Sequence, residues 1–379
     1  MTDLENYKII LEKYFGAGVS TFDPTKATTN NVIAALNRTD FAPFRSAFFQ
    51  RLKRLANRYP NQDANKRHLL ETLNLLGGDR NWEGAYAEIV AFDFLNADQD
   101  WLSNPINLSK TVPATETLAS GLEMNNANLD GFYDDFDICF DVKVFADKSR
   151  EILENMIGKV KKKHGISATI KPEYPLDMDY NVFREKWTAL FSELENKINA
   201  TSQNKFIKSD VIPELSYRIQ WGAGVLMTFS SYNPYIHAEE HHKLLFAHIK
   251  KFSRIMPGLI VFVIFPWFSE KFAGGLMPPE ILYRAFSRRF FCQYAKDATP
   301  ASAFVKDFTS QESVSQVTEM LSGVLFLQDD SIESSVAENQ NVKGYAYLNP
   351  NAKRKVGHAF RHYLSSLKFA VDDFEHDNY

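Results

Sequence analysis

Only two of the 379 residues are cysteines, Cys139 and Cys292, and they lie far apart in the sequence. This scarcity excludes a disulfide scaffold and a cysteine-rich zinc site. The first residues have neither a basic start nor an apolar run, so no signal peptide is predicted. The most apolar run, residues 257–266, is too short to span a bilayer and is typical of a buried strand between two prolines. We therefore expect a soluble, cytoplasmic protein that does not bind membranes.

Several nucleotide and nucleic-acid motifs are also missing. There is no glycine-rich phosphate loop and no helicase-type motif, so ATP dependence is not indicated. Neither a zinc finger nor a helix-turn-helix signature is present. The net charge of −4 excludes a protein that binds nucleic acid over its whole surface. Contacts with phosphates would have to come from local basic runs, and the candidates are Lys159 to Lys163, Lys250-Lys251, Arg284 with Arg288 and Arg289, and Lys353-Arg354-Lys355.

The pattern of apolar residues predicts an α/β protein with a mixed central sheet flanked by helices and a helical N-terminal region. The predicted N-terminal helices cover residues 7–14, 31–36, 41–59 and 63–76, and the third of them carries basic residues that include Arg51 and Arg54. Later helices are expected at 81–95, 147–163, 181–199, 237–252, 279–294, 314–321 and 353–368. Strands are expected at 106–111, 129–133, 136–144, 224–231, 259–265, 323–328 and 344–348. The corresponding domains are a helical region at 1–77, a core at 78–350 with a helical insertion near 166–215, and a basic helix with a frayed acidic tail at 351–379.

Residues 128–144 are predicted to form a β-hairpin. Residues 129–133 extend, Asp134 and Asp135 turn, and residues 136–144 alternate between apolar and other side chains. Because strand side chains alternate with period two, Phe136, Ile138, Phe140, Val142 and Val144 share one face, and Asp137, Cys139, Asp141 and Lys143 share the other. A carboxylate and an amine therefore stand side by side, with Asp130 on the neighbouring strand. A solvated outer face would carry a similar pattern.

The helix at 81–95 carries a glutamate among apolar residues. Ala85, Glu88, Phe92 and Leu95 are spaced so that they lie on one stripe of the helix. A charge on such a stripe is costly unless it is paired or binds a metal. The alternative is that Glu88 lies at the edge of the stripe and reaches water.

These residues, taken in chain order, resemble the PD-(D/E)XK nuclease superfamily. The features shared with it are a helix glutamate, Glu88, a strand aspartate, Asp130, and the Asp141-Val-Lys143 triplet on the next strand, followed by a helix expected to pack on the sheet. The similarity covers residues 80–145 best, although Leu129 replaces the proline of the first motif. The resemblance implies a restriction-endonuclease-like core and a divalent-metal-dependent endonuclease that hydrolyses phosphodiester bonds in DNA, with RNA not excluded. It also implies a restriction or anti-phage defence role.

The same resemblance implies roles for the individual residues. Asp130 and Asp141 would bind Mg²⁺, or Mn²⁺, through carboxylate oxygens, with the carbonyl of Val142 as a third ligand. Lys143 would orient the attacking water or stabilise charge in the transition state, and Glu88 would reach the metal directly or through a water. Asp137 shares a face with Asp141 and stays open as a rival first acidic ligand. Cleavage of both strands of a duplex needs two active sites, so a homodimer is expected.

Two other interpretations remain open. One is a non-catalytic protein that keeps the same fold and binds nucleic acid. The other is a zinc metallopeptidase, because His237-Ala-Glu-Glu240-His241 matches the inverted zinc-peptidase signature and places two histidines one helical turn apart. Such a peptidase needs a third, downstream ligand, and Glu270 and Glu280 are the nearest candidates.

Overall fold

The protein is represented by a computed structural model that describes residues 3–16, 23–28, 30–37, 41–61, 63–78, 81–145, 148–174, 180–199, 205–221, 234–235, 238, 243–265, 278–305, 307–331 and 342–377. The chain divides into two compact units. Unit 1 consists of residues Met1–Phe145 and Pro234–Tyr379, and unit 2 consists of residues Ala146–Asn233.

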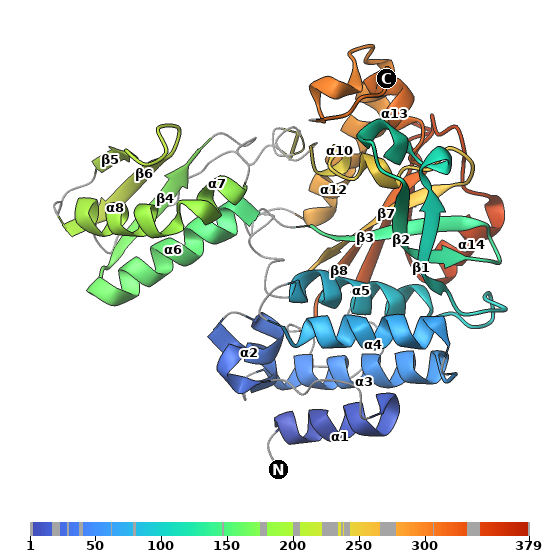
Figure 1. Cartoon of the computed structure of the whole chain (residues 1–379), viewed down its shortest axis with the longest axis horizontal. Helices are drawn as coiled ribbons and strands as arrows, with labels where there is room; N and C mark the ends of the chain where they lie inside the picture. Colours follow the sequence, from blue (N-terminus) through green and yellow to red (C-terminus); the bar gives the residue numbers. More distant parts are fainter. Residues whose placement is uncertain are drawn as a thin grey trace. The chain divides into compact units, whose positions relative to one another are not determined.

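Unit 1 begins with the helical region that the sequence predicts. Its elements are α1 (Asp3–Phe15), η1 (Pro24–Thr28), α2 (Asn31–Asn37), α3 (Ala42–Arg58), α4 (Ala64–Leu76) and α5 (Trp82–Leu95). The side chain of Asp63 caps α4 by accepting a hydrogen bond from the Lys66 backbone N–H at 3.0 Å. Helices α3 and α4 pack on α5, and α1 packs on α3 (Figure 1). Helix α5 is buried along most of its length, which makes it the link between this region and the sheet.

The centre of unit 1 is a seven-stranded mixed sheet in the order β1-β2-β3-β7-β8-β9-β10. Its strands are β1 (Asn107–Pro113), β2 (Asn126–Tyr133), β3 (Ile138–Val144), β7 (Gly258–Ile264), β8 (Gly323–Asp329), β9 (Val342–Leu348) and β10 (Ala370–Asp372). Strands β1, β2 and β3 are antiparallel, β3, β7 and β8 run parallel, β9 is antiparallel to β8, and β10 is parallel to β9. The predicted α/β class with a mixed sheet flanked by helices is therefore confirmed.

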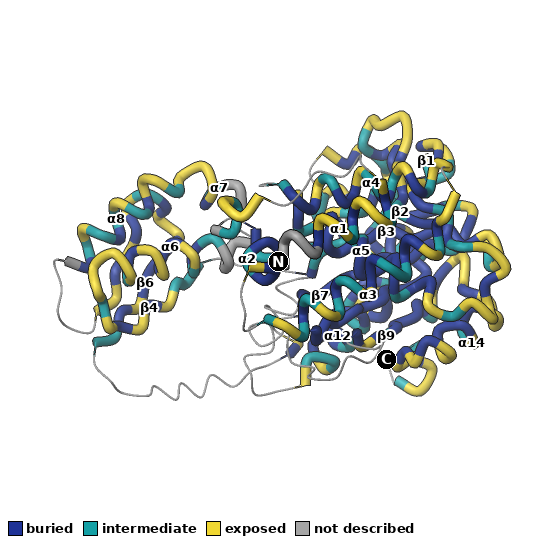
Figure 2. The backbone as a smooth tube through the Cα atoms, turned by 90° about the horizontal axis from the view of Figure 1, so that it is seen from below, coloured by how far each residue is buried: buried dark blue, intermediate teal, exposed yellow. Residues whose placement is uncertain are grey.

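Helices cover both faces of the sheet. On one face, apolar residues of the strands pack with α5 and with α14 (His358–Ser366). On the other face, Phe262 and Phe326 make edge-to-face ring contacts with Phe286 of α12 (Pro279–Arg288). Every residue of the central strands β7 and β8 is buried, and this is why their sequences are continuously apolar instead of alternating. Figure 2 shows the buried residues gathered in these layers.

Short elements complete unit 1. They are η3 (Ala114–Glu116), η4 (Leu118–Leu122), α10 (Lys243–Phe246), η5 (Ile249–Lys251), η6 (Arg289–Gln293), η7 (Tyr294–Lys296), η8 (Ala301–Ala303) and α13 (Val314–Thr318). Among the described residues of the helix expected at 237–252, Ala238 and the two short elements α10 and η5 are helical.

The C-terminal tail differs from the frayed segment that the sequence predicts. Residues 370–372 form β10, and Phe374 is 1% exposed. Asp377 accepts hydrogen bonds from Arg284 at 2.6 Å and from Arg288 at 2.7 Å. The prediction was wrong because the acidic residues of the tail find basic partners on α12. These arginines consequently face carboxylates instead of being available to phosphates.

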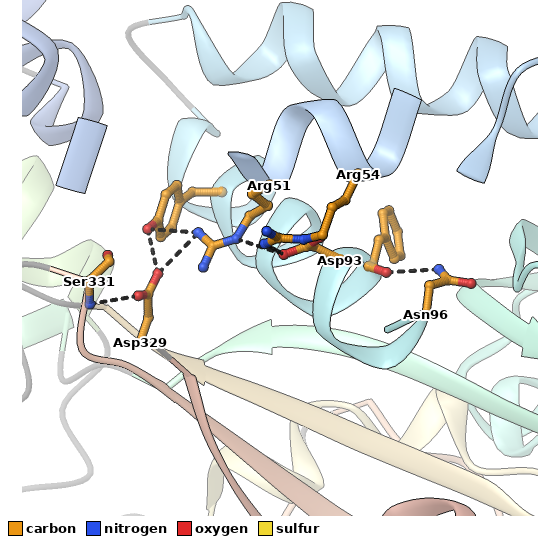
Figure 3. Close-up of polar contacts among 8 residues, drawn as sticks. Arg51, Arg54, Asp93, Asn96, Asp329 and Ser331 are labelled. Atoms are coloured by element: carbon orange, nitrogen blue, oxygen red, sulfur yellow. Dashed lines mark hydrogen bonds and ion pairs between the residues drawn. The ribbon is translucent and has the colours of Figure 1, made fainter. Parts of the chain in front are cut away.

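The basic face predicted for α3 is partly buried as well. Arg51 is 3% exposed and forms ion pairs with Asp93 at 3.4 Å and Asp329 at 3.2 Å (Figure 3). Tyr86 donates a 2.5 Å hydrogen bond to the same carboxylate oxygen of Asp329, and Arg54 binds Asp93. Burial alone lowers the pKa of Arg51, but the carboxylates outweigh that effect and raise it. The network therefore joins α3 and α5 to the end of β8 and keeps Arg51 away from solvent.

Unit 2 has its own core and its own sheet. It contains α6 (Lys148–His164), β4 (Ala168–Glu173), α7 (Tyr180–Glu185), α8 (Trp187–Asn199), β5 (Lys205–Lys208) and β6 (Ser216–Trp221), with the strands in the antiparallel order β4-β6-β5. The insertion expected to be helical near 166–215 thus contains the strands β4 and β5, and β6 follows directly after it. Helix α6, expected on the central sheet, packs in the core of unit 2 with α8 and β4 instead. The strand predicted at 224–231 lies outside the described residues.

Candidate active site

The hairpin predicted at residues 128–144 is present, and its two strands separate at Asp130. Strands β2 and β3 pair at three positions, from Tyr133↔Ile138 to Gly131↔Phe140. Continued in the same register, the ladder would place Asp130 opposite Asp141. Instead, the carboxylate of Asp130 accepts a hydrogen bond from the Val142 backbone N–H at 2.7 Å. A side chain thus replaces a backbone partner at this point, which fixes the carboxylate of Asp130 between the strands.

Two residues next to Asp130 shape this separation. Ser109, which the β1–β2 register places opposite Asp130, has a φ of 60°, a left-handed conformation that is uncommon for serine. The position of Gly131 requires glycine, because a Cβ there would lie 2.0 Å from the Phe140 ring. The function of Gly131 is therefore to admit a buried aromatic ring between β2 and β3.

Asp141 is a buried carboxylate held between two lysines. Its side chain is 1% exposed, and its Oδ2 lies 2.6 Å from Nζ of Lys143. Its Oδ1 lies 3.0 Å from Nζ of Lys251, a residue of η5 whose side chain is 12% exposed. The sequence marks Lys251 as a basic residue but gives no sign that it pairs with Asp141. A buried carboxylate needs such partners, since an isolated buried charge is strongly unfavourable.

Lys143 connects the two aspartates. Its Nζ lies 3.7 Å from Oδ2 of Asp130 and donates a 2.8 Å hydrogen bond to the carbonyl of Val142. The structure therefore brings together Asp130, Asp141, Lys143 and the Val142 carbonyl, the residues that the sequence singles out on the hairpin.

Glu88 lies on α5 and makes its direct contacts with α4. Its Oε2 accepts a 2.9 Å hydrogen bond from Thr72 and lies 3.5 Å from Nε2 of His68. The side chain is 23% exposed, so it is partly solvated. Its charge is one of the smaller causes that raise the pKa values of Asp130 and Lys143. Neither His68 nor Thr72 is marked by a sequence pattern beyond its position on the preceding helix.

The electrostatics of the cluster separate the two aspartates. Burial and the neighbouring charge of Asp141 raise the pKa of Asp130 to about 7. Burial also favours the neutral form of Asp141, but Lys143 and Lys251 outweigh it and lower the pKa of that carboxyl. Burial lowers the pKa of Lys143, whereas the charges of Asp141 and Asp130 raise it, with a net increase. Asp141 and Lys143 are consequently ionised at neutral pH, and Asp130 is poised between its two states.

The turn of the hairpin decides the position of Asp137. Strand β3 begins at Ile138, so Phe136 and Asp137 lie in the turn and not in the strand. Asp137 is exposed and has a φ of 54°, a conformation that aspartate tolerates in turns. The expectation that Asp137 shares a strand face with Asp141 was wrong, and Asp130 is the aspartate beside Asp141.

The carboxylates of the cluster are candidate ligands for a divalent cation. Carboxylate oxygens are the donors that Mg²⁺ and Mn²⁺ prefer, and Asp130, Asp141 and Glu88 supply them. Within the described part of the chain, neither carboxylate oxygen of Asp141 accepts a hydrogen bond of regular geometry. Among these same residues, no three His, Cys, Asp or Glu side chains are gathered as a set of metal ligands. The oxygen donors suit a hard cation in their chemistry, but the carboxylates of Asp130 and Asp141 are paired with lysine ammonium groups in this arrangement.

The zinc-peptidase motif is not described by the structure. His237, Glu240 and His241 lie outside the described residues, and so does Glu270. Glu280 is in the first turn of α12.

Comparison of the chain with protein-family models, with curated proteins and with solved structures finds no match. The resemblance to the nuclease superfamily therefore rests on the site residues and on the order of the elements that carry them. None of the helices that the structure describes is both long and apolar enough to cross a membrane.

Proposed function

We propose that this protein is a divalent-metal-dependent nuclease of the PD-(D/E)XK type that hydrolyses phosphodiester bonds in DNA. The observation that carries the proposal is the separation of β2 and β3, where Asp130 and Asp141 meet Lys143 on one side of the hairpin. The order of elements supports it, because the helix with Glu88 precedes this hairpin in the sequence and α5 packs on β3 in the structure. A restriction or anti-phage defence role in the cytoplasm is part of the same proposal.

The side chains of the cluster have distinct tasks in this proposal. Asp130 and Asp141, with the carbonyl of Val142 and with Glu88, would hold Mg²⁺ or Mn²⁺. The cation, when bound, would stabilise the charge that develops on the phosphoryl oxygens. Lys143 orients the attacking water and stabilises negative charge on the phosphate through its ammonium group.

Lys251 is the second amine of the site and comes from outside the hairpin. Its Nζ lies 3.0 Å from Asp141, so its positive charge stands within the same buried cluster as that of Lys143. We assign it the binding of a phosphate oxygen of the substrate, since a lysine ammonium acts as a point charge toward phosphate.

Cleavage of supercoiled plasmid, single-stranded DNA and RNA, each with Mg²⁺ or Mn²⁺, tests the proposal. The Asp141→Asn and Lys143→Ala variants should each lose about 10²-fold or more of the cleavage rate, because both remove charge that acts in the transition state. Asp137→Asn is the matched control, since it makes the same chemical change in the exposed turn, and it should cleave like the wild type. Cleavage that survives both Asp141→Asn and Lys143→Ala would refute the site.

Metal binding and oligomeric state need separate measurements. Calorimetric titration with Mn²⁺ should show binding to the wild type and its loss in Asp141→Asn, with Asp137→Asn unchanged. Sedimentation at several concentrations tests the homodimer that cleavage of both strands of a duplex requires.

A non-catalytic protein with the same fold is the second candidate, and one observation favours it. Both oxygens of Asp141 already face ammonium groups, at 2.6 and 3.0 Å, which is the arrangement of a stable ion cluster. This candidate predicts DNA binding without cleavage and without Mn²⁺ binding, so the same titration distinguishes the two functions.

A further inference from the structure

The sheet of unit 2 has one covered face and one open face. In β4, Ala168 and Ile170 are buried in the core of the unit, whereas Thr169 and Lys171 are exposed. In β6, Tyr217 and Ile219 join the same core, and Arg218 between them is exposed. This alternation is that of a sheet packed against helices on one side only. Helices α6 and α8 contribute to the core on that side.

The open face carries an exposed aromatic ring beside two cations. The register pairs Lys171 with Arg218 and Arg218 with Phe206, so the three residues form one row across β4, β6 and β5. Directly opposed residues of neighbouring strands point to the same face. Phe206 is 51% exposed, and no other phenylalanine in the described part of the chain is so exposed. The row therefore places a large apolar ring in water at the end of a positively charged line.

The charges around this row are mostly positive. Lys208 follows Phe206 by two residues on β5 and is also exposed. Glu173 is the acidic residue of β4 next to the row, and it forms a 2.8 Å ion pair with Arg218. Thr169 and Gln220 form an uncharged cross-strand pair on the other side of the row. The face as a whole offers three cations, one carboxylate and one ring.

We propose that this open face binds single-stranded nucleic acid, with Phe206 stacking on a base and with Lys171 and Arg218 contacting the adjacent phosphates. A polynucleotide strand presents stackable bases beside anionic phosphates, and the row presents one exposed ring beside two cations. The bases of a duplex are already stacked, so a ring on a flat sheet reaches only unpaired ones. An acidic peptide would match the cations but would leave the ring without an aromatic partner.

This inference rests on the proposed nuclease function for its biological meaning, since it names the unpaired strand as the form of substrate that the protein holds. Binding itself does not depend on cleavage. It is measured on the full chain in EDTA, by fluorescence anisotropy of a labelled oligo-dT of about 20 nucleotides, which exceeds the ~4–16 nucleotides that sheet-based modules cover.

Phe206→Ala should weaken binding by roughly 5- to 150-fold, the range expected for the loss of one stacked base. Phe206→Trp should keep the wild-type affinity because the ring is preserved. Lys171→Glu should weaken binding, and the affinity should fall steeply with salt. Arg184→Glu is the matched charge reversal, because Arg184 is exposed on α7, which packs with α6 and α8 and not on the open face. It should bind within about twofold of the wild type, since it lies outside the contact.

Two outcomes would overturn the inference. One is wild-type affinity in Phe206→Ala, and the other is an equal loss in Arg184→Glu and Lys171→Glu, which would show diffuse attraction. Phe206 is exposed on an edge strand, so its variants should fold, and circular dichroism checks this. If the oligonucleotide binds in a Phe206-dependent way but the chain shows no metal-dependent cleavage, the nuclease is refuted and this inference is supported. If cleavage requires Asp141 but Phe206→Ala binds the oligonucleotide as tightly as the wild type, the nuclease is supported and this inference is refuted.

Discussion

Replacement of Asp130 by asparagine should stabilise the metal-free protein, and by an amount that grows with pH. Burial and the charge of Asp141 raise the pKa of Asp130 from its ordinary 3.8 to about 7 in the folded chain. Between these two values the folded chain keeps a proton that the unfolded chain has lost. The free energy of unfolding of the wild type therefore falls as the pH rises through this window.

The magnitude follows from the same two values. Each pKa unit corresponds to about 1.4 kcal/mol, so the ionised Asp130 costs the folded wild type on the order of 4 kcal/mol above pH 7. Less than half of that cost is already present at pH 5. Asparagine carries no charge, and its side-chain oxygen can still accept the hydrogen bond from the Val142 N–H. The stability gained by Asp130→Asn should consequently increase by about 2–3 kcal/mol between pH 5 and pH 8.

Urea denaturation in EDTA at both pH values measures this difference. Asp137→Asn is the control, because it makes the same chemical change in the exposed turn, away from Asp141. An Asp130→Asn gain that is equal at pH 5 and pH 8 would refute the reasoning, since it would mean that Asp130 titrates alike in the folded and unfolded chains. Addition of Mn²⁺ at pH 8 should reduce the gap, because the proposed cation binds the wild type and offsets the charge of Asp130.

Three other substitutions test contacts within unit 1. Arg51→Met should lower the free energy of unfolding by about 3–5 kcal/mol in urea denaturation, because Asp329 is left buried without its cation. Gly131→Ala should cost about 1–3 kcal/mol in the same assay, since the new Cβ would lie 2.0 Å from the Phe140 ring. Asp377→Asn should change global stability by less than about 1 kcal/mol, as expected for partly solvated ion pairs, but should speed hydrogen exchange in β10. Wild-type stability in Arg51→Met or Gly131→Ala, or wild-type hydrogen exchange in β10 of Asp377→Asn, would show that the contact concerned does not stabilise the structure.

The sequence predicts the elements whose side chains repeat with a clear period. The N-terminal helices follow from stripes such as that of Phe44, Phe48 and Leu52, which are all buried in α3. The neighbouring positions of Asp141 and Lys143 follow from the period of a strand, and their 2.6 Å contact agrees with it. Local rules are sufficient here, because each interaction joins residues that are close in sequence.

The same rules fail where a weak local signal is decided by distant partners. Strand β5 has only four residues, Lys205 to Lys208, and its pairing with β6 makes it a strand. Arg51 lies on a helix face that local charge assigns to solvent, yet its partner Asp329 is 278 residues away. Lys251 likewise reaches Asp141 from a different segment of unit 1. The periodicity of a single element cannot predict these pairings, because they join residues of different elements. Only the folded structure shows them.

The charge balance of the site also explains how the folded chain can bury the carboxylate of Asp141, which is 1% exposed, in the absence of a metal. Asp141 would be strongly destabilising by itself, but the ammonium groups of Lys143 and Lys251 lie 2.6 and 3.0 Å from its two oxygens. The ion cluster therefore supplies in the metal-free chain the positive charge that the proposed cation would supply later. We therefore expect the chain to fold without metal, in contrast to small domains that metal binding folds. The cation would instead relieve the remaining strain at Asp130, whose raised pKa marks the carboxylate that the lysines leave under-compensated.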